Sequence, residues 1–302
     1  MTAVEIELSP DVADAVDSAM PIVALESTIF SHLGLPAPAN GEALERCRRA
    51  VIDGGAVPAL TAILDGRISI GHADPDIICG PARKVAARDI SVAVAQRWPY
   101  GATTVSASLA IAAQAGIEVF ATGGIGGVHR GWEETGDISA DLDALASHQV
   151  VTVSAGAKVF LDLAATLERL ETDSVPVLGW QCDDFPAFHA RSSGLAVPHR
   201  VESADEVADI ARAHWAMGGG GVLVVAPVPE NAAIDFARLT SAVDQALAAA
   251  AATGVVGNAV TPAILGALAD ATDGDSIPTN LALAENNAQV AASIAVALAA
   301  HW

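Results

Sequence analysis

The sequence predicts an α/β protein, a three-layer α/β/α architecture with a central mixed, largely parallel sheet. Compact apolar runs alternate along the chain with longer helical patterns, and this alternation is typical of βα units whose sheet is covered on both faces. Hydrophobic residues make up 52% of the chain and charged residues 17%, so disorder is excluded. Because no internal repeat, linker or sharp change in composition occurs, we expect a single domain spanning residues 1–302.

The predicted strands are short apolar runs. The first is PIVAL at residues 21–25, and it delivers a polar residue, Glu26, at its carboxyl end. Five further runs have the same character, at residues 57–64, 117–121, 150–154, 175–180 and 221–227.

The predicted helices begin with a short one opened by Ser9-Pro10, with Ser9 as N-cap and the proline in the first turn. After a Pro-rich loop at 35–38, a helix is expected near 39–53, and Gly54-Gly55 ends it. Further helical patterns and a long Ala-rich final helix follow, at residues 104–115, 139–148, 203–217, 233–253 and 278–300.

The charge and cysteine content narrow the classes of function. Lys and Arg number 15 against 36 Asp and Glu, a formal net charge of −21, and no basic tract is present to neutralise the phosphates of a long nucleic acid. The three cysteines, Cys47, Cys79 and Cys182, are widely spaced and fit a reducing cytoplasm. No signal peptide opens the chain and no apolar run reaches membrane-spanning length, so we expect a cytoplasmic protein without a membrane partner.

Only two of the 15 basic residues are lysines, Lys84 and Lys158. An amine can lose its proton and attack a carbonyl, whereas a guanidinium cannot. The two lysines are therefore candidates for positions that need an amine, although survival at an ordinary surface explains their number equally well. Lys158 follows the apolar strand VVTVS among small residues, where partial burial would leave neutral amine available for attack. Lys84 lies near Arg83 and Arg88, a cluster that suits a phosphate monoester or an ordinary surface.

Three groups are predicted to meet at one edge of the sheet. Glu26, the glycines after residue 121 and Lys158 all fall at or just past the carboxyl ends of predicted strands. Ligands of open α/β sheets bind at this edge.

The segment TGGIGGVHRG at 122–131 has a glycine-rich loop directly after a strand. Such a loop lets the backbone approach a ligand closely, and its amides can hold an anion. Because His129 stands where the last glycine of a dinucleotide fingerprint would be, a dinucleotide site is not expected. The loop predicts a phosphate or substrate site, with a purely structural glycine turn as the alternative; His129 could equally be a hydrogen-bonding loop residue.

Residues 137–141, DISAD, offer two carboxylates four residues apart. They could bind a hard divalent cation such as Mg²⁺ or Mn²⁺. Alternatively, Ser139 or Asp137 caps the following helix and Asp141 lies in its first turn, and the spacing favours this second reading. The sequence has no Cys/His cluster that would indicate zinc.

Several segments together resemble the pseudouridine-5′-phosphate glycosidases, the indigoidine synthase A-like family. The resemblance covers residues 15–297 in one order, and the pair GGIGGVHRG and DISADL is its most specific part. Departures occur at Phe30, Leu33-Gly34, 97–100, 180–184 and Glu285. The segments that carry it are ALESTIFSH (24–32), GAVPALTAI (55–63), GATTVSASL (101–109), ATGGIGGVHRG (121–131), DISADL (137–142), SAGAK (154–158), VVAPVPE (224–230), VTPAIL (260–265) and NLALAENNA (280–288).

The resemblance implies reversible cleavage of the C–C glycosidic bond of pseudouridine 5′-phosphate to uracil and ribose 5-phosphate. It implies that Lys158 forms a covalent adduct with the sugar, that Glu26 donates a proton and that Asp137 belongs to a Mn²⁺ site, with Mg²⁺ as a possible substitute. It also implies a homotrimer. The substrate contacts that it implies are Lys84, Val105, Ser139, Ala140, Asp141, His129, Asn286 and Asn287.

Two other classes of function stay open on the sequence alone. One is a different sugar-phosphate lyase or aldolase that uses the same Lys158 Schiff base. The other is a non-catalytic protein that binds sugar phosphates.

Overall fold

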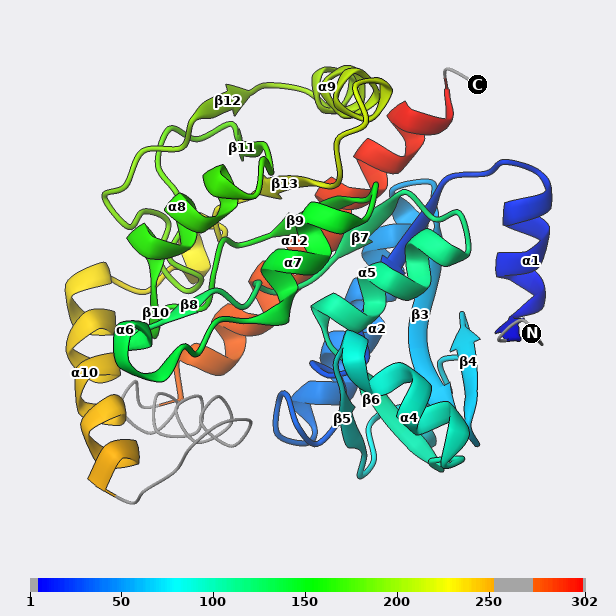
Figure 1. The fold of residues 1–302 in the computed structure, drawn as a ribbon, viewed down its shortest axis with the longest axis horizontal. Helices are drawn as coiled ribbons and strands as arrows, with labels where there is room; N and C mark the ends of the chain where they lie inside the picture. Colours follow the sequence, from blue (N-terminus) through cyan, green and yellow to red (C-terminus); the bar gives the residue numbers. More distant parts are fainter. Residues whose placement is uncertain (1–4, 253–273, 301–302) are drawn as a thin grey trace.

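The computed structural model describes residues 5–252 and 274–300, and these form the predicted three layers. The central sheet has the strand order β1-β4-β3-β2-β7-β9-β13-β11-β12, with β6 beside β3 and β5 beside β6 (Figure 1). Its strands are β1 (Ile6–Leu8), β2 (Ile22–Leu25), β3 (Val57–Leu64), β4 (Arg67–Ile70), β5 (Arg83–Val85), β6 (Tyr100–Thr103), β7 (Val119–Ala121), β9 (Val151–Ser154), β11 (Val177–Trp180), β12 (His199–Val201) and β13 (Val222–Val225). The pair β8 (Val128–His129) and β10 (Leu161–Asp162) forms a separate small antiparallel sheet.

The sheet is mixed and largely parallel, as predicted. Every neighbouring pair from β3 through β2, β7, β9, β13 and β11 to β12 is parallel. Antiparallel pairing occurs on the other side, where β3 pairs with β4 and β6. The parallel strands therefore deliver their carboxyl ends to one edge of the sheet.

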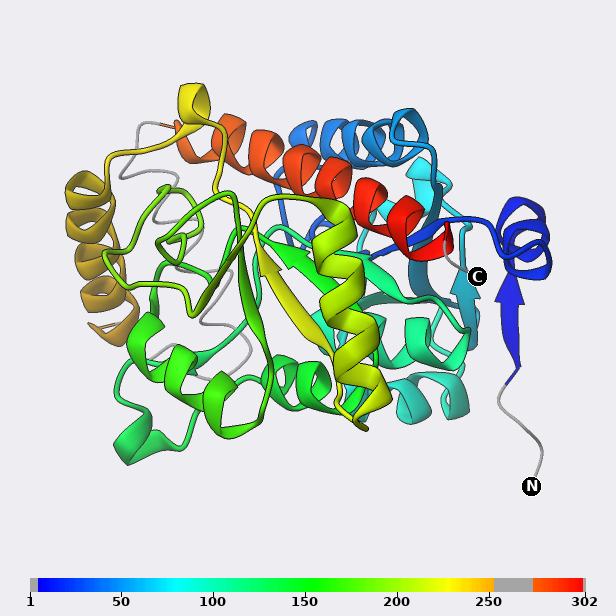
Figure 2. The same ribbon diagram turned by 90° about the horizontal axis from the view of Figure 1, so that it is seen from above.

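Helices cover both faces of the sheet. The helices α2 (Ala39–Asp53), α9 (Ala204–Ala216) and α12 (Ser276–Ala299) lie on one face, and α5 (Val105–Gln114) and α7 (Ala140–Ser147) lie on the other (Figures 1 and 2). The remaining helical segments are α1 (Pro10–Asp17), α3 (Pro75–Ile78), η1 (Ala87–Asp89), α4 (Ile90–Ala95), α6 (Trp132–Thr135), α8 (Leu163–Thr172), η2 (Glu230–Ala232) and α10 (Phe236–Ala252).

The sequence predictions for the long elements are confirmed. Helix α2 and strand β3 have the predicted bounds, and each of the other predicted strands and helices has a counterpart shifted by a few residues. Ser9 occupies the N-cap position of α1, although its side chain makes no capping hydrogen bond. The segment VTPAIL at 260–265 and the end of the predicted helix at 233–253 lie outside the described residues.

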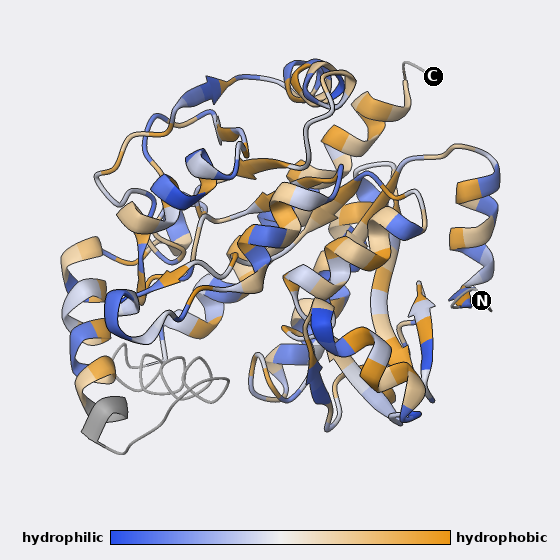
Figure 3. Cartoon of the chain, in the orientation of Figure 1, coloured by the Kyte–Doolittle hydropathy of each residue, from blue (hydrophilic) through white to orange (hydrophobic). Residues whose placement is uncertain are grey.

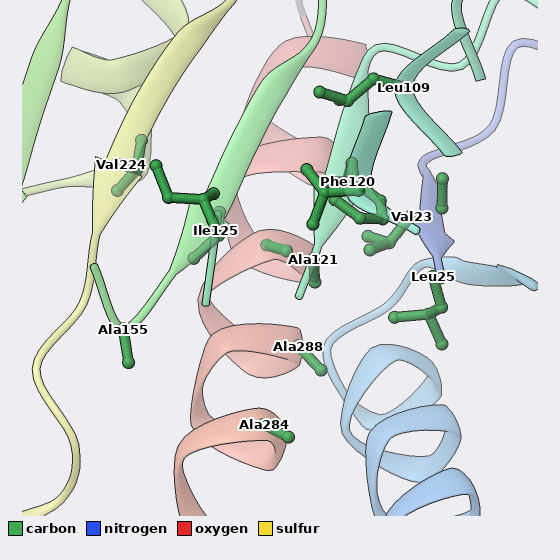
Figure 4. Close-up of a cluster of buried hydrophobic side chains, with 14 of the residues drawn as sticks. Val23, Leu25, Leu109, Phe120, Ala121, Ile125, Ala155, Val224, Ala284 and Ala288 are labelled. Atoms are coloured by element: carbon green, nitrogen blue, oxygen red, sulfur yellow. The ribbon is translucent and has the colours of Figure 1, made fainter. Parts of the chain in front are cut away.

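The core is continuous across the sheet. The central strands are apolar on both faces, whereas blue polar segments lie mainly on the outer surfaces of the helices (Figure 3). Figure 4 shows Val23, Phe120 and Val224 of β2, β7 and β13 in one buried cluster with Ala284 and Ala288 of α12. Burial of these strands on both sides excludes water from the sheet and fixes the positions of the strand ends.

Helix α12 is long and apolar enough to cross a membrane by length and composition, which the sequence analysis did not anticipate. However, 67% of the most apolar 18-residue stretch of this helix is buried inside the protein. The helix packs there against α2, α9 and the strands β2, β7 and β9. This is the position of a core helix in an α/β fold, so the helix is no evidence for a membrane span.

Candidate functional site

A cavity of about 990 Å³ opens at the carboxyl ends of β2, β7 and β9. Its size is at the upper end of the range for small-molecule sites. Its wall includes nine of the eleven residues that the sequence analysis proposed for the site, namely Glu26, Lys84, Val105, His129, Asp137, Ser139, Ala140, Asp141 and Lys158. The other two, Asn286 and Asn287, do not line it.

Glu26 follows β2 directly and is only 8% exposed. The Thr122 hydroxyl, at the end of the neighbouring strand β7, donates a hydrogen bond to its Oε1. Burial raises the pKa of the Glu26 carboxyl above 4.5, and the nearby Lys158 charge opposes this rise only in part. The side chain therefore keeps its proton to a higher pH than an exposed glutamate, which suits a proton donor.

Buried hydroxyl groups fix the backbone around Glu26. Thr103 donates its N–H to the Ser27 hydroxyl at 2.9 Å, and the Thr28 hydroxyl donates to the Thr103 carbonyl at 2.6 Å. These bonds attach the segment after β2 to the end of β6. Because the Ser27–Thr103 bond is buried, breaking it leaves a buried polar atom without a partner, and the segment is held firmly.

Lys158 lies four residues beyond the end of β9 and is half-buried. Its N–H donates to the Ile125 carbonyl at 3.1 Å, so the lysine segment pairs with the glycine-rich loop. Gly156, just before it, has φ 79°, and a Cβ there would stand 2.2 Å from the Pro186 carbonyl oxygen. Only glycine fits this position without moving the lysine segment.

Lys84, on β5, reaches the same cavity from another part of the sheet. Burial lowers the pKa of its ammonium, and the positive charge of Lys158 lowers it further, while Asp141 and Glu26 oppose the change. The two lysines of the chain are thus close enough to influence one another. Their shared positive field favours an anionic ligand.

Asp141 is buried, and its carboxylate accepts hydrogen bonds from two backbone amides. The Ser106 N–H donates at 3.0 Å and the Gly126 N–H at 2.8 Å. A Cβ on Gly126 would lie 2.2 Å from the Ser139 hydroxyl, so this glycine permits the close contact. Asp141 therefore connects the start of α5 with the glycine-rich loop.

The capping interpretation of residues 137–141 is confirmed for Ser139. Its hydroxyl oxygen accepts a hydrogen bond from the Asp141 N–H at 3.2 Å and caps α7. Asp137 is not the cap. Its side chain is 45% exposed, and its Oδ2 lies 3.8 Å from the Nδ1 of His129. Burial lowers the pKa of His129, and Asp137 acts against this shift.

Helices α5 and α7 both begin at the cavity wall. Their first residues, Val105 and Ala140, have no polar side-chain atoms, so they can bind a ligand polar group only through the backbone. Within residues 5–252 and 274–300, neither N–H has an acceptor. Two helix N-termini with free amides next to Lys84 form a positive surface suited to phosphate.

The glycine-rich loop is more structural than its sequence suggested. Its Gly126 N–H is taken by Asp141 and its Ile125 N–H by the Gly156 carbonyl at 3.0 Å. Two of the amides expected to hold an anion thus bind the protein itself. The loop's glycines allow other side chains to approach, and further amides without an acceptor in the described residues lie at the starts of α5 and α7.

The described residues contain no group of three or more His, Cys, Asp and Glu side chains able to enclose a metal ion. A hard cation that keeps most of its waters needs only one or two carboxylates. Asp137, half-exposed at the cavity wall, fits such an ion. The three cysteines are free thiols.

Asn287, on helix α12, holds the backbone at the end of β7 in place. It is fully buried on α12, and its Nδ2 donates to the carbonyls of Thr122 and Gly123 at 2.8 and 3.2 Å. It thereby positions Thr122, the partner of Glu26. Neither Asn286 nor Asn287 lines the cavity, and their substrate contact stays a prediction.

Asn280, which the sequence analysis did not select, lines the cavity. It is 9% exposed, and its Oδ1 lies 3.1 Å from the Nε2 of His189. Asn280 precedes Asn287 by seven residues, so the two share one face of α12. The seven-residue spacing of these asparagines within the segment NLALAENNA is the sequence feature that could have identified Asn280.

Comparison with known proteins identifies the family of this chain. The family model "Indigoidine synthase A like protein" matches residues 11–297. The chain belongs to this family. Relatives named pseudouridine-5′-phosphate glycosidase include one from Mesorhizobium japonicum, 48% identical over 97% of each chain, and one from Alkaliphilus metalliredigens, 45% identical over 97% of this chain and 96% of its own.

Two solved structures have the same fold. The prealnumycin C-glycosynthase AlnA, in complex with ribulose 5-phosphate, superposes with a TM-score of 0.90 at 38% identity, covering 98% of this chain and 97% of its own. An indigoidine synthase A-like protein from Thermotoga maritima gives 0.87 at 35% identity with the same coverage. The family's fold and this chain's fold are therefore the same.

Proposed function

We propose that this chain is an enzyme that reversibly cleaves the C–C glycosidic bond of pseudouridine 5′-phosphate, giving uracil and ribose 5-phosphate. The observation that carries the proposal is a single cavity in which a buried carboxyl with a raised pKa, Glu26, lies within the electrostatic field of a half-buried lysine, Lys158. The names of relatives at 45–48% identity over nearly the full chain support it.

A carbon atom is a poor leaving group, and Lys158 and Glu26 would together make its departure from C1′ possible. The Lys158 amine attacks C1′ while Glu26 protonates the ring oxygen, so the C1′–O4′ bond breaks and the ribose opens. The nitrogen lone pair then forms a C=N bond to C1′ as the C–C bond breaks, and the departing uracil C5 takes a proton. Water hydrolyses the resulting Schiff base, which releases ribose 5-phosphate and restores the amine.

The phosphate would bind at the positive wall of the cavity. Lys84 supplies a charge, and the N–H groups of Val105 and Ala140 supply donors at two helix N-termini. Ser139 lies beside them, while Asp141 mainly holds this wall together through its two backbone hydrogen bonds. A local cluster of this kind is sufficient for one phosphate in a chain with a net charge of −21.

The base would bind at another part of the cavity lining. Phe188 contributes an apolar side chain there, and Asn280 contributes a side-chain amide. An apolar wall with one amide is suited to a flat, neutral ring with carbonyl groups. With the phosphate and base at these two parts of the lining, C1′ would lie near Lys158 and Glu26, the groups that react with it.

Asp137 would hold one Mn²⁺ ion, for which Mg²⁺ is the possible substitute. When bound, the ion would order water molecules and sugar oxygens. His129 lies beside Asp137 and would orient its carboxylate.

The test is condensation of uracil with ribose 5-phosphate, followed by loss of uracil absorbance, with Mn²⁺ and after chelation. We expect product from the wild type and a lower rate after chelation. Absence of condensation under both conditions would reject the proposed function. Equal rates with Mn²⁺ and after chelation would show that the reaction does not need the metal.

A second candidate is joining a sugar phosphate to a larger aromatic carbon acceptor. It is favoured by the resemblance to a C-glycosynthase and by a cavity of about 990 Å³. Offering uracil and a polycyclic phenol as competing acceptors distinguishes the two. Borohydride trapping of ribose 5-phosphate at Lys158 without any condensation product would instead indicate a Schiff-base lyase or aldolase, and tight binding without trapping would indicate a binding protein.

We further propose that the enzyme is a cytoplasmic homotrimer, as the family resemblance implies. Its free thiols are compatible with a reducing compartment. Light scattering of the purified protein should give three times the chain mass of 30.5 kDa. A monomer mass would reject the trimer without affecting the proposed chemistry.

A further inference from the structure

A tight turn at 187–190 presents two rings in different directions. The turn is closed by hydrogen bonds between Ala187 and Ala190, and the Phe188 N–H donates to the Ala155 carbonyl at 3.0 Å, close to the Lys158 segment. Phe188 has φ 59°, a backbone conformation that bulky residues rarely adopt and that is often retained at functional sites. Its ring lines the cavity, whereas the His189 ring is fully buried beside it.

The His189 ring has a single polar partner among the described residues. Its Nε2 lies 3.1 Å from the Oδ1 of Asn280, and its Nδ1 is buried with no hydrogen-bond partner. An amide oxygen can only accept, so Nε2 must carry the proton and Nδ1 the lone pair.

The opposite arrangement is less favourable. If the Asn280 amide turned over and donated to Nε2, the ring proton would move to Nδ1, and a buried N–H would be left without an acceptor. Burial also lowers the pKa of His189 to about 4, so the ring is neutral at physiological pH. The neutral Nε2–H form is thus the one that the surroundings support.

This arrangement determines which end of Asn280 faces the ligand. With Oδ1 bound to His189, the Nδ2 group is the part of the amide left at the cavity wall, and within the described part of the chain it has no acceptor. We infer that His189 is a positioning residue, which holds the Asn280 amide so that Nδ2 donates to a carbonyl oxygen of the base. The inference rests on the proposed function for the identity of the base, but the His189–Asn280 contact does not.

The test compares uracil, 2-thiouracil and 4-thiouracil in condensation with ribose 5-phosphate. A thiocarbonyl is a weak acceptor, so the wild type should disfavour the analogue whose sulfur replaces the bound oxygen by about threefold to tenfold, the value of one neutral hydrogen bond. In His189→Phe the Asn280 amide is free to turn over, so the ratio of the rates with the two thio analogues should fall to about one. His189→Gln retains an N–H donor and should restore part of this difference in rate.

A matched histidine elsewhere separates positioning from general loss of structure. His214 packs against Gly219, outside the cavity lining, so His214→Phe should keep the wild-type discrimination. If His189→Phe slows all three bases in equal proportion, the positioning role is wrong. If the wild type does not condense uracil at all, the proposed function fails, and the next measurement still decides the contact.

The tautomer can be read directly from the wild-type protein by ¹⁵N NMR of the histidine rings, with the His189 signal assigned by its absence in either His189 variant. A proton on Nε2 and none on Nδ1 supports the inference. A proton on Nδ1, or on both nitrogens at neutral pH, overturns it even if His189→Phe fails to fold.

Discussion

The two edges of the same sheet have opposite characters. At the carboxyl edge, the cavity of about 990 Å³ contains Glu26, Lys84 and Lys158. At the amino edge, a cleft of about 300 Å³ lies between α1, α12 and the start of β7, and among the described residues that line it only Glu118 is charged. Both glutamates have a raised pKa caused mainly by burial. A raised pKa therefore does not by itself identify the catalytic glutamate.

The ends of the helices explain why the carboxyl edge of the sheet suits an anionic ligand and the amino edge does not. At the carboxyl edge, α5 and α7 present N-terminal amides with no acceptor in the described residues. At the amino edge, two of the last carbonyls of α12 are already bound, because Arg212 donates to the carbonyls of Ala297 and Leu298 at 3.1 and 2.8 Å. One edge keeps unsatisfied donors for a ligand, whereas at the other edge these two acceptors are satisfied within the protein. This division predicts where substitutions should affect turnover.

Lys158→Arg should have the largest effect. It keeps the positive charge but removes the usable amine, so turnover should be abolished while the thermal midpoint changes little. Borohydride trapping with ribose 5-phosphate should add the mass of the sugar at Lys158 in the wild type and not in the variant. Near-wild-type turnover in the variant would reject the covalent mechanism.

Glu26→Gln should lower turnover by about 10²- to 10⁴-fold, the usual value of a general acid. Because burial raises the pKa of Glu26, the protonated acid persists above pH 4.5, and wild-type cleavage should fall as pH rises through that raised pKa. The variant should lack this basic limb. A basic limb that survives unchanged in the variant would assign the proton to another group.

Lys84→Ala should weaken binding of the phosphorylated substrate about tenfold to a hundredfold, as expected for loss of a charged hydrogen bond. Unphosphorylated pseudouridine should be affected much less, since it lacks the group that the lysine binds. The measurement is kcat/KM for both compounds. An equal loss for the two would exclude Lys84 from phosphate recognition.

Most of the fold could be predicted because short stretches of sequence are sufficient to indicate most of its helices and strands. The glycines after residue 53 end α2 where the sequence indicated, and the apolar run at 57–64 is β3. Strands β4, β5 and β6 are only three or four residues long, and pairing with β3 or with one another defines them. Their positions depend on contacts between distant segments, which periodicity along the chain does not contain.

The site shows the same limit. Glu26 and Lys158 could be placed at the cavity because each follows a strand, and the topology brings strand ends together. The sequence could not show that the Gly126 amide of the glycine-rich loop is bound within the protein, because its acceptor, Asp141, comes from another element. Asn280 was missed for a similar reason, since its position at the cavity and its contact with the distant His189 depend on the fold.

Two carboxylates on one segment provide a test of stability. Asp141→Asn leaves one of two buried amide donors without a good acceptor and should lower the free energy of unfolding by about 1–3 kcal/mol. Asp137→Asn, at a half-exposed carboxylate, should change it by less than about 0.5 kcal/mol but should weaken any response to Mn²⁺. Urea titrations of both variants measure the difference. Equal destabilisation would contradict the supporting role of Asp141.

Glu118→Gln should have the smallest effect and most directly tests the division between the edges. Burial raises the pKa of Glu118 in the folded protein, and Arg212 opposes this only in part. A raised folded pKa means that the stability contributed by Glu118 is present below pH 4.5 and is lost as pH rises through the folded value. The variant should remove this pH dependence, by less than about 1 kcal/mol because the side chain is only partly buried, and leave kcat unchanged. Loss of turnover in Glu118→Gln would show that the amino edge takes part in the reaction, since this substitution is the same as that at Glu26 and differs only in the edge of the sheet.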